Sequence, residues 1–241
     1  SIYQLLPKAV VVPKTVEDVR EVIYFAKKNG FSVLARGAGT SQNGQTVNKS
    51  IVIDNSKYLN KVLDFDPISR SCTVEPGIVL DELNRFLKPH GLFFPVDVST
   101  SSRATIGGMV GNNSAGGRSI RYGIMRDNVN SIDVITSNSE LARFGMMPEH
   151  TFGLGEVLPE LLNLGLNNRF EIERRFPKVL RRVGGYNLDA LLEGTLSERP
   201  GSNAAPSDIN LAHLIVGSEG TLNYSSAIEL KLSPLPAAKI M

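Results

Sequence analysis

The chain of 241 residues contains one cysteine, Cys72, three histidines and no tryptophan. A single thiol excludes an internal disulfide framework and a metal site built from several thiolates. The histidines, His90, His150 and His213, lie far apart in the sequence, without the short spacing typical of metal ligands. We therefore expect no histidine-rich metal site.

Long apolar runs and an excess of charge are also absent. No run approaches the roughly 20 apolar residues that a membrane-spanning helix requires, and no signal peptide opens the sequence. A net charge of +2 is too balanced to indicate nucleic-acid binding. We expect a cytoplasmic protein without a transmembrane segment or a nucleic-acid partner. Neither end of the sequence has the features of a natural chain terminus, so we expect a fragment of a longer protein.

Hydrophobic periodicity predicts interleaved helices and strands, and thus an α+β fold. A helix capped by Thr15 and Asp18 is expected at 15–28, and another, containing Leu80, Leu83 and Leu87, ends near Gly91. A mainly helical stretch follows at about 156–193, and 194–208 is expected to be flexible. Strands are expected at 51–56, 131–137, 140–145 and 225–236, a buried strand at 31–35, and a hairpin of 62–66 with 71–77. Residues 211–222 are expected as a buried strand that leads into a glycine turn.

The stretch RGAGTSQNGQT, residues 36–46, comes close to two nucleotide-binding motifs. Gln45 stands where a P-loop has the lysine that neutralises a triphosphate. Residues 42–50 are too few and too polar for the helix that a Rossmann fold needs after its glycine loop. The remaining interpretation is a loop between strands whose backbone N–H groups bind a diphosphate. A glycine turn without a ligand is the alternative.

Two further segments are rich in small residues. TIGGMVGNNSAGG, residues 105–117, combines five glycines with Asn and Ser, which offer both donors and acceptors to a flat ligand. GSEGTL, residues 217–222, follows an apolar stretch and contains one acid. Three such segments predict a long ligand with a phosphate in its middle.

The motifs ARGAGTSQNGQ, TVEPGIVLDELNRFLKPHGLFFPVDVSTSSRATIGGMVGNNSAGG and IVGSEGTL together resemble a known family. It is the FAD-binding domain of the vanillyl-alcohol-oxidase and p-cresol-methylhydroxylase type. Within it, the chain is most similar to the FAD-linked D-2-hydroxy-acid dehydrogenases, which include D-lactate dehydrogenase, the glycolate oxidase FAD subunit and D-2-hydroxyglutarate dehydrogenase. The stretch RFPKVLRRVGGYNLDALL, 175–192, resembles the subgroup fused to an iron–sulfur region.

The resemblance implies two α/β lobes with FAD held between them. The first lobe would span residues 1–66. The second would span 67–241, with a mainly helical insertion at about 146–210. The family's substrate domain, which supplies the catalytic histidine, and any iron–sulfur region would lie outside this fragment. No catalytic residue is therefore assigned, and the fragment alone is expected to be inactive.

The resemblance also implies the residues that bind FAD. They belong to the three glycine-rich segments and to two short stretches near the second segment. The set is Arg36, Gly37, Ala38, Gly39, Thr40, Ser41, Gly44, Gln45, Pro95, Val96, Asp97, Thr105, Gly107, Gly108, Gly111, Asn112, Asn113, Ser114, Gly116, Gly117, Tyr122, Gly123, Glu219, Gly220 and Thr221. No histidine lies between residues 1 and 89, so we expect non-covalent FAD, and Cys72 is expected in the core.

The implied function is oxidation of a small D-2-hydroxy acid of the lactate, glycolate or 2-hydroxyglutarate class by hydride transfer to FAD. The electron acceptor is open between a quinone and a carrier protein, and an iron–sulfur cluster is an option for the missing C-terminal part. Attachment to the inner membrane surface is the alternative to a free cytoplasmic location. Two other functions stay open: a flavin-dependent reductase of the enolpyruvyl-sugar-nucleotide type, and a redox-silent nucleotide-binding module.

Basic residues are predicted to share a face of a helix in the insertion. They are Arg174, Lys178, Arg181 and Arg182. Because a carboxylate substrate is best held by a bidentate arginine, Arg182 and the nearby Tyr186 are candidates for substrate contact. Three other arginines, Arg118, Arg121 and Arg126, compete for that role.

Overall fold

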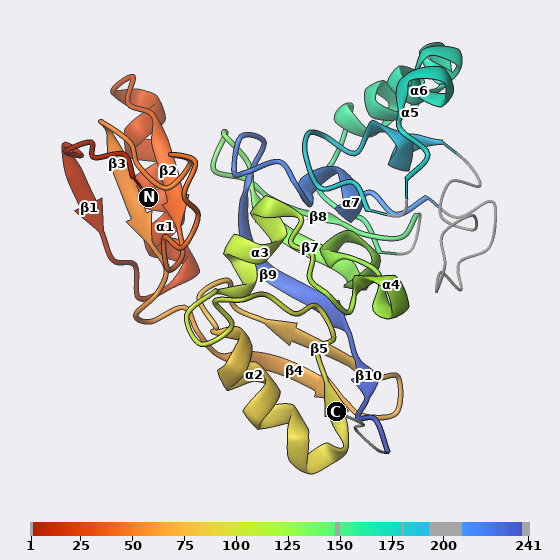
Figure 1. Cartoon of the computed structure of the whole chain (residues 1–241). Helices are drawn as coiled ribbons and strands as arrows, with labels where there is room; N and C mark the ends of the chain where they lie inside the picture. The colour runs from red at the N-terminus through yellow and green to blue at the C-terminus, as the bar shows by residue number, and fades with distance from the viewer. Residues whose placement is uncertain (1, 148–149, 180, 193–208, 238–241) are drawn as a thin grey trace.

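The computed structural model describes residues 2–147, 150–179, 181–192 and 209–237. Two lobes of unequal size lie side by side, and the smaller one contains the N-terminal strands and helix (Figure 1). This is the α+β architecture with two lobes that the sequence predicts. The segment expected to be flexible, 194–208, lies outside the described residues.

The first lobe is a parallel sheet of three strands covered by one helix. The strand order is β1 (Ala9–Val11), β3 (Ile51–Asp54) and β2 (Val33–Arg36), with α1 (Val16–Lys28) against the sheet. As predicted, Thr15 and Asp18 close a reciprocal capping box at the start of α1. The buried face of α1 carries Val19, Ile23 and Ala26.

Strand β2 is an edge strand, so the prediction of a buried strand at 31–35 is wrong. Its side chains alternate between exposed and half-buried, and Val33 is 37% exposed. The buried strand is β3, because β1 and β2 flank it on both sides. An apolar run indicated a strand correctly here but could not show its place in the sheet.

The second lobe contains an antiparallel sheet of five strands that differ in length. Their order is β4 (Val62–Asp66), β5 (Ser71–Val74), β9 (Tyr224–Lys231), β7 (Val129–Ile135) and β8 (Leu141–Phe144). β4 and β5 form the expected hairpin, and β9 alternates buried and half-buried residues as predicted. With the predicted lobe boundary at residue 66, β4 would belong to the first lobe. In the structure β4 pairs with β5 of the second lobe, so the chain crosses between the lobes at 55–61.

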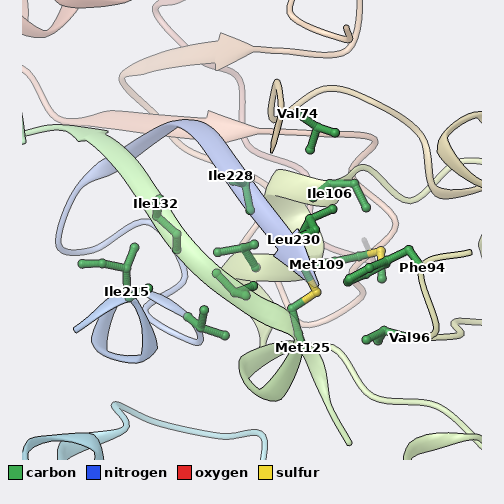
Figure 2. Packing of buried hydrophobic residues seen from close by; sticks show 14 of the residues in the cluster. Val74, Phe94, Val96, Ile106, Met109, Met125, Ile132, Ile215, Ile228 and Leu230 are labelled. Atoms are coloured by element: carbon green, nitrogen blue, oxygen red, sulfur yellow. The ribbon is translucent and has the colours of Figure 1, made fainter. Parts of the chain in front are cut away.

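The main core lies between this sheet and the helices beside it. Figure 2 shows Val74, Ile132, Ile228 and Leu230 of the sheet near Ile106, Met109 and Phe94. Helix α2 (Leu80–Leu87) buries its predicted leucines there, and a 3₁₀ turn (Lys88–His90) ends at Gly91 with φ +70°. The short strands β6 (Leu92–Phe93) and β10 (Ser233–Pro234) pair beside it. Cys72 is a core residue as predicted, and burial raises the pKa of its thiol to about 12.

Two segments have a secondary structure different from the prediction. Residues 211–222, expected as a buried strand that leads into a glycine turn, contain the short helix α7 (Ala212–Ile215) in place of the strand, followed by the turn, and His213 is buried in that helix. Residues 105–117, expected as a loop, contain α3 (Ile106–Asn112), capped by Thr105. A short apolar run such as that at 211–216 is compatible with a strand or with a buried helix. The glycines at 105–117 have low helix propensity, so the sequence did not indicate a helix there.

The insertion contains α5 (Val157–Asn167), α6 (Arg169–Arg175) and a 3₁₀ turn (Leu188–Leu191), well away from the first lobe (Figure 1). The predicted basic helical face is wrong, because α6 ends at Arg175. Phe176 is extended, at φ −69° and ψ 125°, as expected for a residue that precedes a proline. Two smaller helical segments, α4 (Ser119–Tyr122) and a 3₁₀ turn (Met125–Asn128), precede β7. Within the described residues, no helix is both long and apolar enough to span a bilayer.

Candidate functional site

A cavity between the two lobes collects the three glycine-rich segments. The residues predicted for the site that line it are Arg36, Gly37, Ala38, Gly39, Thr40, Ser41, Gln45, Thr105, Gly107, Gly108, Gly111, Asn112, Ser114, Glu219 and Gly220. They come from the loop after β2, from α3 and from the turn after α7. Segments more than 170 residues apart in sequence (Ser41 and Gly220, for example) therefore share one surface.

Other predicted residues lie outside the cavity lining. They are Gly44, Pro95, Val96, Asp97, Asn113, Gly116, Gly117, Tyr122, Gly123 and Thr221. The sequence reasoning in turn missed lining residues that carry no glycine signal, of which Asn55 and Tyr224 make the clearest contact. Asn55 directly follows β3, and a polar residue at the end of a buried strand is a signal that could have identified it.

Several of the outlying residues have structural reasons for their identity. A Cβ on Gly116 would lie 1.9 Å from the backbone oxygen of Asp97, so this glycine permits close packing of two chain segments. Gly123 has φ +76° and packs against Asp127. Asn113 is fully buried in the left-handed conformation at the end of α3, where its Oδ1 accepts from the backbone N–H of Arg126.

The loop after β2 presents unused backbone donors to the cavity. The N–H groups of residues 37–41 donate to no acceptor in the described part of the chain. Gly39 has φ +68°, and the guanidinium of Arg36 lies across it, at 2.6 Å from where a Cβ would be. Arg36 Nη1 is also 3.8 Å from Asp54 Oδ2. Consecutive amides beside a cation form a site for an anion.

This loop and α3 contact each other directly across the cavity. Asn112 Nδ2 donates to Ser41 Oγ at 2.8 Å. A Cβ on Gly37 would lie 2.0 Å from Thr105 Oγ1 and 3.2 Å from Thr105 Cβ, so a side chain at this position would force Thr105 to rotate and the two lobes to move slightly apart. The identity of Gly37 therefore determines how closely the two lobes approach.

Helix α3 contributes a flat surface rather than anion donors. The N–H of Ile106 donates to the oxygen of Ile78 at 2.9 Å, and that of Gly107 to the oxygen of Pro76 at 2.8 Å. The N–H of Gly108 donates to Thr105 Oγ1 at 3.4 Å. With its first donors occupied, the helix offers Gly108 and Gly111, whose missing side chains let a planar group approach the backbone.

The third segment is a strained turn attached to the end of α3. Gly217 has φ +86°, Gly220 has φ +75°, and Glu219, a residue with a side chain, has φ +53°. The N–H groups of Gly217 and Glu219 donate to the oxygens of Val110 and Gly111 at 2.9 and 3.0 Å. Strain of this kind persists where the surroundings hold it in place, often at functional sites.

A tyrosine joins the two lobes at the edge of the cavity. Tyr224 Oη donates to Asn55 Oδ1 at 2.8 Å. Burial raises the pKa of the Tyr224 hydroxyl, and the nearby charge of Glu75 raises it further. The hydroxyl therefore stays protonated and keeps its role as a donor at physiological pH.

The residues present fit an extended dinucleotide. Gln45 Oε1 is buried in the cavity lining and has no hydrogen-bond partner in the described chain, so it can accept from a ligand donor. The amides of residues 37–41 with Arg36 suit a diphosphate, and the bare face of α3 suits a planar ring. No group of three or more His, Cys, Asp or Glu that could hold a metal occurs among the described residues.

Comparison with known proteins also indicates a domain of a dinucleotide-binding family. Residues 7–145 match the family described as FAD binding domain. The chain is 33% identical over 250 residues to D-2-hydroxyglutarate dehydrogenase of Pantoea ananatis, covering 99% of this chain and 24% of that protein. It is 26% identical to glycolate oxidase subunit GlcD of Bacillus subtilis, covering 98% of this chain and 39% of that protein. The chain thus spans about a quarter to two fifths of these relatives.

A solved structure supports the fold. Alkyldihydroxyacetonephosphate synthase superposes with a TM-score of 0.62 at 21% identity, covering 95% of this chain and 32% of that protein. Because the match to the family covers more than half of the chain, and the fold agrees with it, this protein belongs to the FAD-binding domain family.

Proposed function

We propose that the cavity between the lobes holds FAD, with its diphosphate on residues 37–41 and Arg36. The observation that carries this proposal is that three separated glycine-rich segments line one cavity, with unused backbone donors on one side and a bare helix face on the other. The flavin ring would lie along Gly108 and Gly111, and Gln45 would accept a hydrogen bond from the cofactor. No covalent link is expected.

In the whole protein, the proposed reaction is oxidation of a small D-2-hydroxy acid. The relatives named D-2-hydroxyglutarate dehydrogenase and glycolate oxidase subunit support this substrate class. Bound FAD would supply a ring that accepts a hydride. The residues of this chain would bind and orient it and exclude water from one face, while the base for the hydroxyl proton is expected in the part of the protein beyond this chain.

Substrate reduction of the flavin tests the reaction. The full-length protein should purify yellow, release its flavin on denaturation, and lose its colour without oxygen when a D-2-hydroxy acid is added. Lactate, glycolate and 2-hydroxyglutarate should be compared, with the L-enantiomers of the chiral acids as controls. Bleaching by NADPH instead would indicate a reductase, and a colourless protein that takes up no FAD would contradict the proposal.

Gly111→Ala is expected to change FAD affinity and stability in opposite directions. The new Cβ would lie 3.7 Å from the nearest protein atom, an ordinary contact. Alanine in a helix should raise the stability of the FAD-free protein by up to about 1 kcal/mol. The methyl group would occupy space proposed for the flavin, so FAD affinity should fall at least about tenfold. Fluorescence titration and thermal melts measure both, and unchanged affinity would remove Gly111 from the proposed contact.

A further inference from the structure

Residues 182–189 lie outside the cavity lining but contact two of its walls. Asn187, 1% exposed, donates from Nδ2 to the backbone oxygens of His213 and Val216, at 3.0 and 2.8 Å. Its Oδ1 accepts from Arg182 Nη2 at 3.1 Å. These bonds hold the end of α7, where the strained turn at 217–221 begins.

A second contact reaches the other end of that turn. Tyr186 Oη lies 2.8 Å from Thr221 Oγ1. The Thr221 hydroxyl donates its single proton to the backbone oxygen of Ser218 at 2.6 Å. Tyr186 is therefore the donor in the Tyr186–Thr221 pair. Between these two contacts lie Glu219 and Gly220, which line the cavity.

The same segment also supports the end of α3. The backbone oxygen of Arg182 accepts from Asn113 Nδ2 at 3.4 Å, and Asn113 caps α3. Helix α3 has seven residues, three of them glycine, which is too short and too flexible to be stable alone. It therefore depends on tertiary contacts at its C-terminal end.

The segment is itself held by a partly buried ion-pair cluster. Asp189 accepts from Arg126 Nη1 with both carboxylate oxygens at 2.9 Å, and from Arg182 Nη2 at 2.6 Å. Arg126 is fully buried and Arg182 is largely buried. Arg182, a candidate for substrate contact from the sequence, therefore has an internal carboxylate partner.

We propose that residues 182–189 act as a brace that fixes the turn at 217–221 and the end of α3 in the geometry that binds FAD. Tyr186 and Asn187 are its positioning residues. The inference rests on the proposed FAD site, and it assigns a role to a stretch of the insertion that does not line that site. The strained φ of Glu219 is the feature that most needs this support.

Tyr186→Phe in the full-length protein tests the brace. Loss of one hydrogen bond should weaken FAD binding about 2- to 10-fold, and the visible circular dichroism of the bound flavin should change. The melting temperature of the FAD-free protein should stay near the wild-type value, because Tyr186 is 46% exposed. Tyr24→Phe is the matched control: Tyr24 is 55% exposed and lies on α1, outside the cavity lining.

A double-mutant cycle tests the pair itself. Thr221→Val removes the other half of the contact, so the double variant Tyr186→Phe/Thr221→Val should bind FAD no more weakly than Thr221→Val alone. Two results would contradict the brace: losses of FAD affinity in the two single variants that add up in the double variant, or unchanged FAD affinity in Tyr186→Phe. If wild-type protein itself bound no FAD, the proposed site would fail instead, so the two failures are distinguishable.

Discussion

Gly37→Ala is expected to weaken FAD binding by about 100-fold or more, which corresponds to nearly 3 kcal/mol. The added Cβ would lie 2.0 Å from Thr105 Oγ1 and 3.2 Å from Thr105 Cβ. Rotation of Thr105 would move its Oγ1 away at the cost of its cap on the N–H of Gly108, but Thr105 Cβ would stay 3.2 Å from the new methyl group, so the loop at 36–41 and the start of α3 would also have to separate slightly. Because that separation widens the cleft in which both halves of the cofactor must be held, affinity should fall much more than local stability does. Equilibrium titration with FAD measures the effect.

Two further variants control this prediction. Gly117→Ala places a Cβ 3.8 Å from Asp97 Oδ2, an ordinary contact outside the cavity lining, so FAD affinity should not change. Thr105→Ala in the Gly37→Ala background removes the clashing oxygen and should restore part of the lost affinity, although the helix cap is lost with it. Wild-type affinity in Gly37→Ala would show that the approach of the lobes does not control the cofactor site.

Gly116→Ala is expected to lower the free energy of unfolding by about 3 kcal/mol or more, even without FAD. Its Cβ would lie 1.9 Å from the backbone oxygen of Asp97 and 2.1 Å from Asp97 Oδ1. A side chain can rotate away from such a clash, but a backbone oxygen moves only if the chain around it moves. Urea unfolding of the FAD-free protein measures the loss.

The neighbouring glycine provides the control. A Cβ on Gly117 would lie 3.8 Å from Asp97 Oδ2, an ordinary contact, so Gly117→Ala should unfold like the wild type. If instead Gly116→Ala kept its stability and lost FAD, then Gly116 would act on the cofactor, as the family resemblance implied. Comparison of these two adjacent variants therefore shows whether Gly116 acts through packing or through the cofactor.

The elements predicted correctly are those whose signals are local. Thr15 and Asp18 cap α1 through bonds within four residues. The hairpin β4–β5 and strand β9 follow from alternation and a turn. The incorrect secondary-structure predictions at α3 and α7 share one cause: the backbone conformation there is determined by partners distant in sequence, such as Pro76 for Gly107 and Asn187 for the end of α7.

The candidate site, too, was predicted correctly only where its signal is local. Glycine content identified the three glycine-rich segments of the cavity lining, because small residues are visible in any sequence. It could not show which glycines face a ligand and which face the protein. Gly111 lines the cavity, whereas Gly116 packs against Asp97. Asn55 and Tyr224 carry no such compositional signal and meet only because β3 and β9 come together.

By itself, the sequence determined the class of fold, the caps of its first helix and the three glycine-rich segments that line the proposed dinucleotide site. These depend on residue types and spacings within a few residues of one another. Only the tertiary structure decided that the segments face one cavity, that Arg182 pairs with Asp189 and that Gly37 touches Thr105. Such contacts depend on the packing of two lobes, and a distance between atoms far apart in the chain is not encoded by any local pattern.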